Sequence, residues 1–105
     1  LLSEDVAERV AKTLKVLANP IRLRILALCL RREYTSRELR EILGISKPLL
    51  IAHLRKLVDA GFLEYRVELD RGKMIVRKYY RTKSDIRVCV DKALLEKVAE
   101  NLEGV

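Results

Sequence analysis

Apolar residues recur at helical spacing near both ends of the chain. Over residues 3–18 they appear every three to four positions, which predicts an amphipathic helix. Asn19 and Pro20 follow, an N-cap and a residue favoured at the first helical position, so a second helix should begin at once. The helical period returns over residues 85–102 and predicts a last helix.

Two short helical patterns lie in the middle of the chain. Thr35 and Glu38 form a Thr-x-x-Glu capping box, which predicts a helix start. Gly44 supplies a left-handed C-terminal residue and Ser46 supplies the next N-cap, so only a tight turn separates the two helices. Gly61 ends the second one. Two helices joined by a short turn that contains glycine are typical of the helix-turn-helix, whose second helix enters the DNA major groove.

After this motif the period of the apolar residues changes to two. Leu63 to Leu69 alternate with polar residues as in a half-buried strand, and Met74 to Arg81 form a second strand beyond a turn. The pattern predicts a β-hairpin over residues 62–82. The segment 66–87 holds eight basic and three acidic residues, a net charge of +5. The hairpin region therefore carries most of the excess positive charge.

Together these elements predict a mostly helical α+β fold. A two-helix motif followed by a basic hairpin is a winged helix-turn-helix, here with extra helices at both ends. We expect a single domain spanning 1–105, divided into an N-terminal helix at 3–18, a helix-turn-helix at 35–61, a wing at 62–82 and a C-terminal helix at 85–102.

The second helix of the motif should bury Leu50 and Leu57 and turn its opposite face outward. That face offers few groups for hydrogen bonds with bases, so specificity should depend also on the wing and on DNA deformability. Lys47 lies in the first turn, where the helix dipole penalises a cation unless a phosphate is near. The DNA contacts that we predict are Ser46, Lys47, Pro48, Leu49, Ala52, Arg55 and Lys56 on this helix, and Arg71 and Lys73 at the hairpin tip.

No motif for hydrolysis, phosphoryl transfer or dinucleotide binding occurs, so we expect no enzyme activity. The sole histidine, His53, is interpreted as a helix-flank residue that bonds a neighbour or a phosphate. Cys29 and Cys89 belong to no Cys-x-x-Cys or Cys/His cluster. Both lie in predicted helices and are interpreted as small buried hydrophobes, with a redox pair or a thiolate metal site as the alternatives.

The 105-residue chain has a formal charge of +7 and a pI near 9.7, which favours a polyanionic partner. No long uncharged apolar stretch or signal-peptide pattern is present, so nucleic acid is favoured over membrane, and we expect a cytoplasmic protein. Charged residues make up 35%, and glutamine is absent. This bias is typical of proteins from hot environments.

Three stretches, 14–26, 38–46 and 53–63, closely resemble the ArsR family of winged-helix transcriptional regulators. The resemblance covers about residues 12–82. It implies a homodimer, built by the first and last helices, that binds a near-palindromic operator in duplex DNA and represses until an inducer loosens it. The interface residues expected on that basis are Val6, Val10, Leu14, Leu94, Leu95, Val98 and Leu102.

Many members of that family sense metals through a Cys-x-Cys in the first helix of the motif, or through histidines and carboxylates on the last helix. The corresponding stretch here, residues 33–37, has no thiol, and the last helix has Asp91, Glu96 and Glu100 but no histidine. Zinc and copper prefer thiolate and imidazole ligands. We therefore expect no metal cofactor, and the inducer remains unidentified.

Two other functions stay open at the level of sequence. Winged helices also serve as protein-interaction modules, and Leu49 and Ala52 would suit a protein groove. A nonspecific, chromatin-like DNA-binding protein would have the same basic charge.

Overall fold

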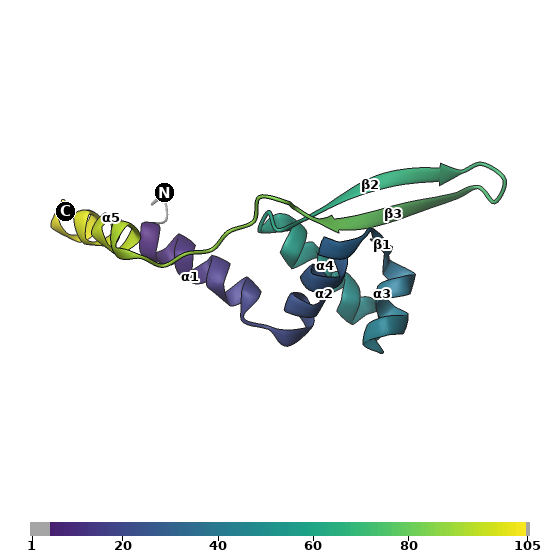
Figure 1. Cartoon of the computed structure of the whole chain (residues 1–105), viewed down its shortest axis with the longest axis horizontal. Helices are drawn as coiled ribbons and strands as arrows, with labels where there is room; N and C mark the ends of the chain where they lie inside the picture. Colours follow the sequence, from purple (N-terminus) through teal and green to yellow (C-terminus); the bar gives the residue numbers. More distant parts are fainter. Residues whose placement is uncertain (1–4, 105) are drawn as a thin grey trace.

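The computed structural model describes residues 5–104 and is mostly helical, with one antiparallel sheet whose strand order is β1-β3-β2 (Figure 1). The predicted α+β winged helix-turn-helix fold is confirmed. Within the described residues the elements are α1 (Val6–Leu17), α2 (Pro20–Arg31), β1 (Tyr34–Thr35), α3 (Ser36–Leu43), α4 (Lys47–Asp59), β2 (Leu63–Asp70), β3 (Ile75–Thr82) and α5 (Lys92–Glu103).

The molecule is elongated, with α2, α3 and α4 forming a central body. The β2–β3 hairpin projects from one side of this body, and α1 and α5 extend from the other (Figure 1). The described chain measures 60 × 28 × 24 Å, and its radius of gyration is 17.3 Å. A compact domain of this length would have a radius of gyration of about 13 Å. Both extensions therefore stand away from the core.

The core lies where α2, α3 and α4 meet the base of the sheet. The inward face predicted for α4 is confirmed, because Leu50, Leu54 and Leu57 are all buried. Thr82 Oγ1 donates a hydrogen bond of 2.7 Å to the Leu26 carbonyl and so attaches the end of β3 to α2. The buried apolar residues are Ile25, Leu26, Cys29, Leu39, Leu50, Leu54, Leu57, Phe62, Leu63 and Tyr80.

Local signals place the helix-turn-helix as predicted. The Thr35 hydroxyl accepts from the Glu38 amide and the Glu38 carboxylate accepts from the Thr35 amide, which completes the capping box. Gly44 ends α3 with φ +66°, a left-handed conformation that glycine adopts without strain. At Gly61, φ is +84°, and the amides of Gly61 and Phe62 donate to the carbonyls of Val58 and Leu57. This Schellman motif turns the chain from α4 into β2.

The sheet differs from the sequence prediction in two respects. β1, which was not predicted, pairs with β3 through Tyr34 opposite Tyr80. The prediction that the first hairpin strand is half-buried was wrong for most of its length. Leu63 is buried at the base, whereas Val67 is 57% exposed and Leu69 is also exposed. The outer half of the hairpin projects beyond the helices of the body, so it does not pack against them (Figure 1).

The last helix starts later than predicted. Residues 86–90 are not helical, and α5 begins after Asp91, whose carboxylate accepts from the Leu94 amide at 2.9 Å. Cys89 lies in this segment and is exposed, so the expectation that it is helical and buried was wrong. Cys29 is buried in α2 as predicted, and burial raises the pKa of its thiol to about 12.

The first helix begins at Val6, with Asp5 as its N-cap. Residues 3 and 4, which the sequence assigned to this helix, lie outside the described residues. α1 and α5 lie against each other, and the Val6 amide donates to Asn101 Oδ1 at 3.2 Å. No side chain of α1 or α5 is buried in the described chain. Their apolar residues therefore remain accessible to a partner.

Candidate nucleic-acid interface

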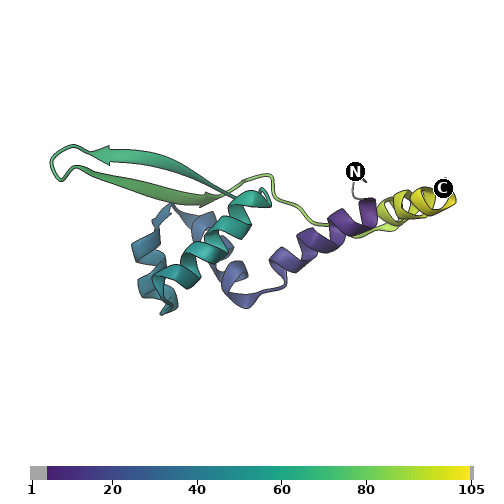
Figure 2. The ribbon, with the colours of Figure 1, turned by 180° about the vertical axis from the view of Figure 1, so that it is seen from behind.

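Helix α4 is held by its inner face and presents its outer face to solvent. Ser46 is its N-cap and accepts from the Leu49 amide at 3.4 Å, with Lys47 and Pro48 in the first turn. Seen from behind, α4 lies in front of the other helices of the body (Figure 2). The DNA contacts predicted on this helix, Ser46, Lys47, Pro48, Leu49, Ala52, Arg55 and Lys56, are all exposed. Their role in DNA contact stays a prediction.

The hairpin tip carries the two remaining predicted contacts, Arg71 and Lys73, and both are exposed. The strands stay paired up to Asp70 opposite Ile75, which leaves a loop of residues 71–74. Asp70 Oδ1 accepts from the amides of Gly72 and Lys73 at 3.1 and 3.2 Å. The loop therefore has a fixed shape, held by two backbone amides that donate to one oxygen of the Asp70 carboxylate.

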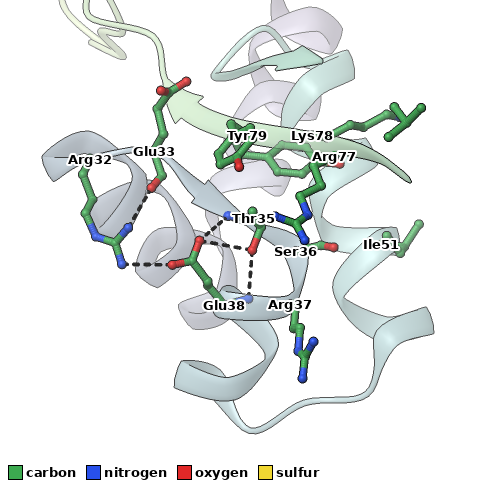
Figure 3. A pocket seen from close by; sticks show the side chains of 12 residues that line it. Arg32, Glu33, Thr35, Ser36, Arg37, Glu38, Ile51, Arg77, Lys78 and Tyr79 are labelled. Carbon is green, nitrogen blue, oxygen red and sulfur yellow. Dashed lines mark hydrogen bonds and ion pairs between the residues drawn. The ribbon is translucent and has the colours of Figure 1, made fainter. Parts of the chain in front are cut away.

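A groove with a volume of about 880 Å³ separates the hairpin from the helix-turn-helix (Figure 3). Its walls are β3, the start of α3 and Ile51 of α4, and Arg77 extends from β3 toward Ser36. This groove was not predicted. Its lining comprises Arg32, Glu33, Thr35, Ser36, Arg37, Glu38, Ile51, Val76, Arg77, Lys78, Tyr79 and Tyr80.

The carboxylates of this groove are engaged by neighbouring groups. Glu38 accepts from the Thr35 amide and pairs with Arg32 at 3.2 Å, and these interactions lower the pKa of its carboxyl. Glu33 pairs with Arg66 at 2.8 Å. Within residues 5–104, by contrast, no hydrogen bond or ion pair engages the Arg77 guanidinium. Arg37 pairs with Glu41 at 3.3 Å, and the Lys78 ammonium lies 4.6 Å from the centre of the Tyr65 ring. The Arg77 guanidinium is therefore the groove cation most available to an anion.

Sequence reasoning missed Arg37, Arg77 and Lys78 as candidate contacts. The charge count on the hairpin included Arg77 and Lys78 but gave them no position. The position of Arg77 and Lys78 beside α3 depends on the pairing of β3 with β1, and these two strands lie far apart in the sequence. Strand alternation alone could not show which hairpin residues approach the helices.

His53 lies on the buried side of α4 and is only 7% exposed. Its Nδ1 accepts a hydrogen bond of 3.1 Å from Nε of Arg22. Of the two partners left open by the sequence, His53 therefore bonds a neighbour. Burial lowers the pKa of the imidazole, and the nearby charges of Arg22 and Lys56 lower it further.

Arg22 also explains why a cation is tolerated in the first turn of α2. Its Nη1 donates to the carbonyls of Val16 at 3.1 Å and Lys15 at 3.4 Å, in the last turn of α1. Helix C-termini favour a positive charge. The same side chain thus binds carbonyls at the end of α1 and, through His53, connects α2 with α4.

Residues 5–104 contain no group of three or more His, Cys, Asp or Glu side chains arranged to hold a metal ion. None of the helices in this range has the length and apolar character needed to cross a membrane.

Comparison with known proteins gives consistent matches. Residues 19–65 match the family model described as "bacterial regulatory protein, arsR family". The chain is 33% identical over 92 residues to an HTH-type transcriptional regulator of Methanocaldococcus jannaschii, a match that spans 88% of this chain and 94% of that protein. It is 35% identical over 63 residues to the biofilm growth-associated repressor of Xylella fastidiosa, across 60% of this chain and 55% of the repressor.

Solved structures agree with the fold. The crystal structure of NolR from Sinorhizobium fredii superposes with a TM-score of 0.64 at 28% identity and covers 92% of this chain and 84% of NolR.

Proposed function

Because this chain belongs to the ArsR family of bacterial regulatory proteins, we propose that its α4 face, groove and hairpin tip form one continuous DNA-binding surface. The chain is a DNA-binding transcriptional regulator and not an enzyme. The observation that carries the proposal is the exposed outer face of α4, which lies beside a cationic groove that leads to a basic hairpin. We propose that the regulator acts as a repressor.

In this proposal α4 enters the major groove. Lys47, Arg55 and Lys56 approach phosphates or base edges, and Leu49 and Ala52 pack against thymine methyl groups. A helix with so few hydrogen-bonding groups reads few bases directly. Much of the sequence preference therefore comes from DNA shape and from contacts made by the wing.

The groove between hairpin and helices binds the DNA backbone that flanks the major groove. Arg77 and Lys78 on β3 and Arg37 on α3 supply positive charge along it. A backbone strand there lets α4 lie in the major groove while Arg71 and Lys73 reach the neighbouring minor groove. The proposed surface is thus longer than the one expected from sequence.

The active form in this proposal is a homodimer formed through α1 and α5. These helices bury no side chain within the single described chain, and Leu95 and Leu102 are 57% and 71% exposed. Exposed apolar surface of this kind is a common mark of a protein interface. The interface residues proposed are Val6, Val10, Leu14, Leu94, Leu95, Val98 and Leu102.

Selection of bound duplexes from random DNA tests the function most directly. Enrichment of a near-palindromic sequence, bound with an affinity that falls steeply with salt, is the expected result, because cationic contacts to phosphates release counterions. A flat sequence preference would instead support a nonspecific DNA-coating protein. Salt-insensitive retention of a protein partner without DNA would support an interaction module.

A further inference from the structure

The hairpin tip carries one apolar side chain in an unusual setting. Met74 ends the loop with φ +53°, and within the described residues it is the one non-glycine residue with a positive φ. Side chains other than asparagine and aspartate rarely adopt this left-handed conformation, and glycine is the usual choice. The requirements of the turn therefore do not explain why a methionine occupies this position.

Packing within the chain does not explain Met74, because its side chain is 81% exposed. The loop that carries it is nonetheless well fixed. Asp70 Oδ1 accepts two amide hydrogen bonds inside the loop, and the strands remain paired up to Asp70 opposite Ile75. The thioether is thus held beyond the end of the sheet by an ordered backbone.

The surroundings of Met74 combine apolar and cationic character. Arg71 and Lys73 lie in the same four-residue loop and are exposed. Asp70 is the nearest acidic residue in sequence, and its Oδ1 is occupied by backbone amides. The tip therefore presents the exposed apolar side chain of Met74 beside the positive charges of Arg71 and Lys73.

We infer that Met74 is an apolar wedge that enters the DNA minor groove and partly unstacks one base step. Methionine is among the residues that proteins insert between bases from the minor groove, and phosphates on both sides would pair with the two cations. Flexible pyrimidine–purine steps are the easiest to open, so this tip selects such a step beside the major-groove site. The inference rests on the proposed function, in which the tip reaches the minor groove.

The test uses a duplex of about 30 base pairs that the protein itself has selected from random DNA, long enough to hold both half-sites and their flanks. One set of duplexes carries 2-aminopurine at single positions in the flanking region, and another carries fluorescent dyes at its two ends. Wild-type protein should raise 2-aminopurine fluorescence at one step in each half-site and bring the dyes closer together. The preference for a pyrimidine–purine step over a stiff A-tract should be about tenfold, as for one ordinary base contact.

Two substitutions separate the side chain from the backbone conformation. Met74→Asn keeps a residue that tolerates a positive φ but removes the apolar chain, so it should abolish the fluorescence rise and most of the step preference. Met74→Leu keeps an apolar wedge and should retain both effects. Far-UV circular dichroism confirms that both variants are folded.

Equal fluorescence and bending for wild type and Met74→Asn would overturn the wedge, and so would a duplex that stays fully stacked with wild-type protein. Arg71→Ala distinguishes this failure from a failure of the proposed function. If Arg71→Ala weakens binding but no base unstacks, the tip contacts DNA without a wedge. If wild-type protein binds no duplex, both proposals fall.

Discussion

Nε of Arg22 donates a hydrogen bond to Nδ1 of His53, so a guanidinium in the second helix supports an imidazole in the recognition helix. Both side chains are buried, and Arg22 also donates to two carbonyls at the end of α1. One side chain thus connects three helices. Two of them, α1 and α4, are the elements proposed to form the dimer and to bind DNA.

This relationship predicts a pH dependence of stability. His53 accepts at Nδ1, and the pKa of its imidazole is lowered in the folded protein by burial and by neighbouring cations. The unfolded chain therefore binds a proton more readily than the native one. The contribution of His53 to the free energy of unfolding should be complete at pH values above 6.5, near the imidazole pKa of the unfolded chain. It should decrease as the pH falls from there toward the lower pKa of the folded state.

Urea unfolding at pH 7.5 and pH 5.5, a range of about two units around the ordinary histidine pKa, measures this effect. His53→Asn is the matched variant, because its amide oxygen stands where Nδ1 does and accepts from Arg22 without titrating. It should lose about 1 kcal/mol at the higher pH and show little change between the two values. An identical decline in both proteins would assign the pH dependence to other groups.

The position of α4 predicts the effect of a negative charge on its outer face. Ala52 is exposed, so Ala52→Glu should leave the fold intact. A carboxylate facing DNA phosphates should lower affinity by at least about 100-fold, since like charges brought together across an interface cost several kcal/mol. Gel shifts with selected DNA measure it, and Ala52→Ser, small and neutral, serves as the control. Wild-type affinity in the glutamate variant would refute this docking geometry.

The cations of the tip and groove should act mainly through phosphates. Replacing Arg71, Lys73 or Arg77 by alanine should weaken binding to all sequences alike and reduce the slope of log affinity against log salt by about one per contact. Fluorescence anisotropy at several salt concentrations provides this slope. Lys97→Ala, on α5 at the other end of the molecule, should change neither quantity (Figure 1). A loss confined to one DNA sequence would indicate base readout instead.

The terminal helices should determine the oligomeric state. Leu95 and Leu102 are exposed in the single chain, so Leu95→Glu combined with Leu102→Glu should not disturb its folding. The change should shift the mass in sedimentation equilibrium from that of a dimer to that of one 12.1-kDa chain. Lys92→Glu adds negative charge to the same helix at a residue outside the proposed interface and should remain dimeric. A dimer that survives the double substitution would place the interface elsewhere.

Features determined by neighbouring residues were predicted well from the sequence. The capping box at Thr35, the left-handed Gly44 and the helix end at Gly61 each depend on contacts within six residues, so the sequence contains the whole signal. The outward face of α4 followed from its period for the same reason.

Features that join distant segments were not predicted. Arg22 and His53 are 31 positions apart, and β1 is only two residues long, too short for any periodic pattern. The start of α5 was ambiguous because Ile86 and Val90 fit a helical spacing, while Val88 between them fits a strand-like alternation. The N-cap Asp91 was the signal that could have decided the boundary.

The projection of the hairpin beyond the body has a consequence for protein engineering. Its inner end at Leu63 and Thr82 is anchored in the core, but Val67 and Leu69 farther out contribute little to folding. Substitutions of the exposed side chains in that outer half should therefore cost little free energy of unfolding. The DNA preference of the wing can therefore be re-engineered while the helical scaffold stays unchanged.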